Sequence, residues 1–86
     1  MEPTVEDLAA IATRVRTASL RHDHPDKTWG GMGNGRRCDA CRRSIEQAEL
    51  ELEADFDEGK TTLRFHAACF MAWQRAAEEW RRLLAN

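Results

Sequence analysis

Four side chains with metal-binding chemistry stand in two pairs along this chain. The first pair is Cys38-x2-Cys41 and the second is His66-x2-Cys69. Structural zinc sites hold the ion in a tetrahedron of four thiolate or imidazole ligands, and three cysteines with one histidine supply such a set. A full set of protein ligands leaves no position for water. We therefore expect these four side chains to bind one zinc ion with a structural rather than a catalytic role.

The number and surroundings of the cysteines favour zinc over other thiol chemistry. The chain has three cysteines, and an odd number does not close into a disulfide set. A redox Cys-x-x-Cys motif is expected near a βαβ pattern, which is not present, and iron–sulfur clusters usually take four cysteines. Zinc-dependent deaminases carry proline before the first cysteine, whereas Arg37 precedes Cys38 here.

The segment between the two ligand pairs has the alternation of a β-hairpin over residues 49–66. Its apolar positions alternate with five acidic ones, which predicts one buried and one solvated face. The apolar positions of the first strand are Leu50, Leu52, Ala54 and Phe56. The sequence Asp57-Glu58-Gly59-Lys60 predicts the turn. Such a hairpin would return the chain to its starting point and bring the two ligand pairs together.

The turn length also predicts the register of the hairpin. A four-residue loop pairs Phe56 with Thr61 and places the apolar residues of both strands on one face. On the other face it sets Glu53 opposite Arg64, which is a favourable cross-strand pair. A slip of one residue would bury the acidic side chains, so this register is strongly favoured.

Two amphipathic helices are predicted, over residues 4–21 and 67–85. Thr4 and Asp7 have the spacing of a capping box at the start of the first. The apolar stripe of the second is formed by Phe70, Trp73, Ala77, Trp80 and Leu84. Because both stripes step by three and four residues, the helices can pack within one chain or against a second copy. We expect a monomer or a homodimer formed through the helices.

Residues 22–37 are predicted to be a glycine-rich loop. Four glycines fall close together there, at positions 30, 31, 33 and 35, which disfavours regular structure. We expect Trp29, at the centre of the loop, to pin it to the core. His22 and His24 are either additional metal ligands or ordinary exposed histidines, and the second reading is the better one.

The chain is expected to form a single small α+β domain over residues 1–86. The order of elements is a helix over 4–21, a glycine-rich loop over 22–37, and then a zinc knuckle, a hairpin and a helix over 38–86. A chain of 86 residues buries only a modest core. We therefore expect an additional cross-link, such as a bound metal ion, to stabilise the folded state.

The order of knuckle, hairpin and helix resembles a treble-clef zinc finger. The half-motif Phe65-His66-x2-Cys69 is similar to the second ligand pair of LIM-type fingers. With Trp29-Gly30 before the knuckle and Trp73 after the ligands, the chain also resembles small uncharacterised bacterial zinc-binding proteins. The likeness covers about residues 36–80. It implies a structural zinc but no single activity, because treble clefs include protein adaptors, nucleic-acid binders and a few nucleases.

The net charge and the local distribution of charge bear differently on whether the chain binds nucleic acid. A formal net charge of −2 argues against a protein that coats nucleic acid through bulk charge. Four arginines nevertheless bracket the knuckle, namely Arg36, Arg37, Arg42 and Arg43. They could contact nucleic acid or a protein partner, or they could offset the charge of the thiolates.

The most consistent interpretation is a small structural-zinc interaction module that binds a protein partner, with nucleic-acid binding as the alternative. Its working surface would be the arginine-flanked knuckle, Trp29 or the far end of the last helix. No nucleophile–base pair and no open metal position is visible, so we expect no enzyme. We also expect a cytoplasmic protein, because no signal peptide or membrane-spanning apolar run is recognisable.

Overall fold

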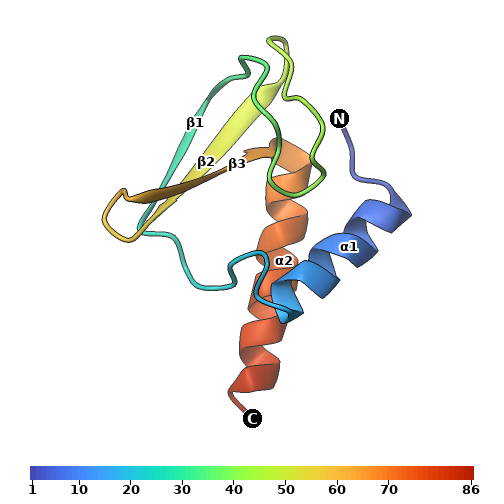
Figure 1. Cartoon of the computed structure of the whole chain (residues 1–86), viewed down its shortest axis with the longest axis vertical. Coiled ribbons are helices and arrows are strands. Elements are labelled where there is room, and N and C mark those ends of the chain that lie inside the picture. Colours follow the sequence, from blue (N-terminus) through green and yellow to red (C-terminus); the bar gives the residue numbers. More distant parts are fainter.

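The computed structural model describes all residues from 1 to 86 as two helices and one antiparallel sheet (Figure 1). The elements follow in the order α1 (Val5–Arg16), β1 (Lys27–Met32), β2 (Leu50–Phe56), β3 (Thr61–His66) and α2 (Ala67–Leu84). The three strands lie in the order β1-β2-β3. Helix α2 contacts β2 and β3, and α1 packs along α2 rather than on the sheet. The predicted α+β class is therefore confirmed.

The hairpin has the predicted strands and register. Phe56 lies opposite Thr61 and Glu53 lies opposite Arg64, so the connecting turn has four residues. The Glu53 carboxylate and the Arg64 guanidinium are 3.6 Å apart on the polar face. Asp57, Glu58 and Gly59 all have positive φ angles in the turn, and glycine adopts such angles most readily.

The prediction of a loop over residues 22–37 is wrong for its middle part, which is strand β1. This strand pairs along its whole length with β2, and Gly33 N–H extends the ladder by donating to Glu49 O at 2.8 Å. Glycine is a poor strand former, but the ladder of backbone hydrogen bonds to β2 overrides that local preference. Every residue of β1 is exposed, as suits a strand at the sheet edge.

The prediction that Trp29 is pinned to the core is also wrong. In the observed register Trp29 lies opposite Glu53, on the polar face of the sheet. The residue is 52% exposed, and its Nε1–H donates to Asp55 Oδ2 at 2.6 Å. Trp29 therefore belongs to the surface and is available for contacts with another molecule.

Helix α1 begins as predicted and ends earlier than predicted. Thr4 and Asp7 form the reciprocal hydrogen bonds of a capping box. The helix ends at Arg16 rather than at residue 21, because Ala18 adopts φ 65° and turns the chain back. The turn brings Leu20, only 3% exposed, into the core.

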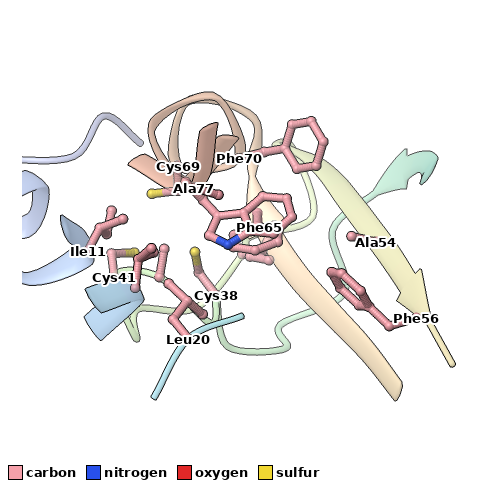
Figure 2. Close-up of a cluster of buried hydrophobic side chains, with 14 residues drawn as sticks. Ile11, Leu20, Cys38, Cys41, Ala54, Phe56, Phe65, Cys69, Phe70 and Ala77 are labelled. Atoms are coloured by element: carbon pink, nitrogen blue, oxygen red, sulfur yellow. The ribbon is translucent and has the colours of Figure 1, made fainter. Parts of the chain in front are cut away.

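Helix α2 supplies the centre of the hydrophobic core. Trp73 is 1% exposed and stacks on Phe65 with ring centroids 5.1 Å apart. Phe56 and Phe70 meet the indole from two other directions. Figure 2 shows the cysteine side chains on the side of this aromatic cluster that faces Ile11 of α1. The site and the core are thus one continuous buried unit.

The predicted apolar stripe of α2 is covered only along its first half. Phe70, Trp73 and Ala77 are buried, whereas Trp80 is half-buried and Leu84 is 56% exposed. Helix α1 covers part of the remainder, and the C-terminal end of α2 extends beyond it (Figure 1). Neither helix combines the length and the apolar composition that crossing a bilayer requires.

Candidate metal centre

The first ligand pair lies in a tight turn between β1 and β2. Cys38 N–H donates to Arg43 O, and Arg42 N–H donates to Cys38 O, both at 2.9 Å. Arg42 has φ 70°, in the left-handed region, which lets the chain reverse directly after Cys41. A short bridge between Arg37 and Ser44 closes the turn at its base. These contacts hold both thiols on the inner side of the turn.

The second pair stands where the sheet passes into α2. His66 is the last residue of β3 and the N-cap of α2, and Cys69 lies in the first helical turn. Residues three apart at the start of a helix can face the same point. The hairpin returns β3 alongside β2, so this pair reaches the knuckle as the alternating pattern predicts.

The structure brings the four side chains together. One ligand atom from each of Cys38, Cys41, His66 and Cys69 lies within 4.8 Å of every other. The four residues are at most 9% exposed. Zinc bonds of about 2.3 Å to sulfur and about 2.05 Å to nitrogen would place a sulfur and a nitrogen about 3.6 Å apart in a tetrahedron.

Two of the three sulfur–nitrogen distances are close to that value. His66 Nδ1 lies 3.4 Å from Cys41 Sγ and 3.9 Å from Cys69 Sγ. These two values lie on either side of the tetrahedral one, and no pair of the four ligand atoms is more than 4.8 Å apart, so the cluster could hold a metal ion with Zn²⁺-like bond lengths once its wider pairs draw together.

The orientation of the His66 ring is fixed from outside the cluster. Its Nε2 lies 3.0 Å from the Ser44 carbonyl oxygen, which has no proton to give, so Nε2 must carry the hydrogen. The lone pair of the neutral ring is then on Nδ1, the atom that faces the cysteines. Outer contacts of this kind commonly orient metal-binding histidines.

The three neighbouring thiols shift one another's pKa values. A hydrogen bond from Cys69 lowers the pKa of Cys38 to about 4, and the same interaction raises the pKa of Cys69. Burial raises the pKa of Cys41. Two thiols thus retain protons that must leave before three thiolates can bind a cation together. Metal binding is consequently coupled to proton release.

Two residues outside the ligand set hold the knuckle in place. Arg14 of α1 donates from Nη1 to the carbonyl oxygens of Asp39 and Ala40, at 2.9 and 3.0 Å. The Asp39 carboxylate accepts from Arg64 N–H at 2.6 Å, and Asp39 N–H donates to Arg64 O at 2.7 Å. The knuckle is therefore tied to α1 and to the outer edge of β3. Sequence spacing could not reveal these contacts, because they involve backbone groups of residues distant in the chain.

The four knuckle arginines do not form one free patch. Arg43 pairs with Asp7 of α1 at 2.5 Å, and Arg37 donates to the Arg42 carbonyl at 2.8 Å. Arg36 and Arg42 are exposed, and neither forms an ion pair. Two of the four arginines are thus engaged within the chain.

The two histidines considered as additional ligands and Trp29 do not belong to the cluster. His22 and His24 are not part of the group of potential metal ligands. Trp29 stands on the polar face of the sheet, among the acidic residues of β2.

No protein-family model, curated protein or solved structure matches this chain. The resemblance to treble-clef fingers accordingly stays a prediction from the spacing of the ligands and the order of the elements.

Proposed function

We propose that the Cys3His cluster binds one zinc ion and that this ion has a structural role. The observation that carries the proposal is the convergence of four buried ligand atoms within 4.8 Å of one another. The ligands come from two segments, the knuckle and the junction of β3 with α2. An ion held by all of them would fasten the sheet to the helix, as in a treble clef. Such a set of ligands is complete, so the chemistry it supplies is cross-linking of the chain.

A small domain fastened in this way supports a role in binding other molecules. A structural metal allows a short chain to fold around a modest core, and leaves its surface free for recognition. The exposed edge strand β1 is the clearest candidate surface. Its outward backbone groups can pair with an extended segment of a partner protein. Trp29, half-exposed on the same strand, would supply an aromatic anchor.

The partner proposal is tested by capture from the native cell with zinc-loaded bait. The expected result is a reproducible set of proteins that the wild-type chain retains and Trp29→Ala loses. Arg82→Ala, on the exposed face of α2, which does not contact β1, is the matched control and should retain the same set. An empty capture, or one that Trp29→Ala leaves unchanged, would count against the β1 surface.

Nucleic-acid binding is the second candidate, favoured by the exposed guanidinium groups of Arg36 and Arg42 beside the knuckle. It predicts a mobility shift that weakens steeply with salt and with the double variant Arg36→Ala, Arg42→Ala. Arg82→Ala, on α2, is the control. Absence of a shift at low salt would exclude this role.

A further inference from the structure

Helices α1 and α2 enclose an apolar groove that nothing in the chain fills. The groove has a volume of about 450 Å³ and is lined mainly by alanine, leucine, methionine and tryptophan side chains. Three of its large apolar residues are exposed to solvent: Leu8 is 47% exposed, Met71 62% and Leu83 55%. Exposed apolar side chains concentrated in one groove are typical of an interface.

The charged residues beside this groove have no partner within the chain. Arg75 and Glu79 lie one helical turn apart on α2 and both line the groove. Neither forms an ion pair, although Glu78 and Arg82, at the same spacing on the adjoining face, lie 3.9 Å apart. Glu2 and Arg16 also line the groove and form no ion pair, so the charges of α2 next to exposed apolar groups remain to be matched by another molecule.

The order of these residues along α2 is self-complementary. Arg75 and Glu79 lie equally far before and after residue 77, and so do Met71 and Leu83. The outer pair spans about 18 Å of helix at 1.5 Å per residue. An antiparallel second copy, related by a two-fold axis that passes through the groove side of α2 at the height of residue 77, would set each Arg75 beside the other copy's Glu79. It would also place each Met71 at the level of the other copy's Leu83.

We infer that this groove is the interface of a homodimer in which the α2 helices of two copies pack antiparallel. A two-fold axis uses each contact twice, so one Arg75–Glu79 match yields two ion pairs. A partner with a different sequence would have to reproduce the reversed order of charges, whereas a second copy has it already. This inference is independent of the partner surface proposed on β1.

Sedimentation equilibrium of the full, zinc-loaded chain tests the inference, from the low micromolar to the submillimolar range. The wild type should dimerise. Either Arg75→Glu or Glu79→Arg alone would place like charges opposite each other in both symmetry-related contacts. Each should raise the dissociation constant of the dimer at least about tenfold. The double variant Arg75→Glu, Glu79→Arg restores opposite charges and should recover most of the affinity. Glu58→Arg, a matched reversal in the hairpin turn, should change nothing.

A variant outside the charge pair distinguishes loss of the dimer from loss of the fold. Leu83 is more than half exposed near the end of α2, so Leu83→Asp should leave the far-UV spectrum intact while weakening the dimer. A wild type that stays monomeric throughout the range overturns the inference and leaves the groove to a different partner. A dimer that Arg75→Glu and Leu83→Asp do not weaken, or single variants that the double variant does not rescue, would overturn it as well.

Discussion

Replacing Trp73 by phenylalanine tests how the core and the metal cluster are held together. Trp73 is 1% exposed, and its Nε1–H donates to the Arg21 carbonyl oxygen at 2.7 Å. Phenylalanine keeps the stacking on Phe65 but leaves the Arg21 carbonyl without this donor, which costs about 1 to 1.5 kcal/mol. The space vacated by the second ring adds about 1 to 1.5 kcal/mol. We expect Trp73→Phe to lower the free energy of unfolding by about 2 to 3 kcal/mol.

The assay is denaturant unfolding of the zinc-loaded protein, followed by far-UV circular dichroism at one fixed free zinc concentration. Fixing the zinc concentration matters because bound metal contributes to the measured stability. Trp80→Phe is the matched control. Trp80 is half-buried and its indole forms no hydrogen bond within the chain, so the expected loss is below about 1 kcal/mol. A loss for Trp73→Phe no larger than that for Trp80→Phe would refute this account of the core.

Three further predictions concern the backbone, an ion pair and the thiols. A Cβ on Gly33 would lie 2.1 Å from a backbone carbonyl oxygen. Gly33→Ala should therefore lower the free energy of unfolding by several kcal/mol, measured by thermal unfolding. A Cβ on Gly31 would have no atom within 4 Å, so Gly31→Ala is the control and should be nearly neutral. The hydrogen bond from Arg43 lowers the pKa of Asp7 from 3.8 to about 2; the stability it contributes is therefore present above pH 3.8 and lost as the pH falls through 2. Arg43→Ala should raise that pKa in a carboxyl NMR titration, and an unchanged titration would contradict the pairing. Because Cys69 has a raised pKa, zinc binding should release protons and weaken as the pH falls; calorimetry in buffers of different ionisation enthalpy measures this, and binding without proton release would contradict it.

The hairpin could be predicted in detail because several signals agree there. Alternation specifies the buried face over residues 52–56, and Gly59 allows the positive φ angle of the turn. The prediction is wrong at the start of β2, where Leu50 is 49% exposed and Glu51 only 5%. A shift in register would bury acids, so even the pairing of Glu53 with Arg64 follows from the sequence. The capping box at Thr4 is predictable for a similar reason, since both of its hydrogen bonds are local.

The local sequence does not predict strand β1 or the positions of Trp29 and Trp73. The glycines of residues 30–35 indicate a loop, and only the backbone of β2, distant in sequence, makes part of that segment a strand. Nothing local distinguishes Trp29, on the polar face, from Trp73, at the centre of the core. Their positions depend on tertiary packing, which overrides local propensity.

The ligand set of the site could be predicted, but its supports could not. Spacing identifies Cys38, Cys41, His66 and Cys69 because each pair must face a common point. The contacts of Arg14 with knuckle carbonyls have no counterpart in spacing, since any arginine on that helix face has the same side-chain chemistry.

The central claim is that Cys38, Cys41, His66 and Cys69 bind one zinc ion. X-ray absorption at the zinc edge of the purified protein tests it most directly. The account predicts one zinc per chain with three sulfur neighbours at about 2.3 Å and one nitrogen neighbour at about 2.0 Å. A chain that binds no zinc, or zinc surrounded by oxygen ligands, would contradict it.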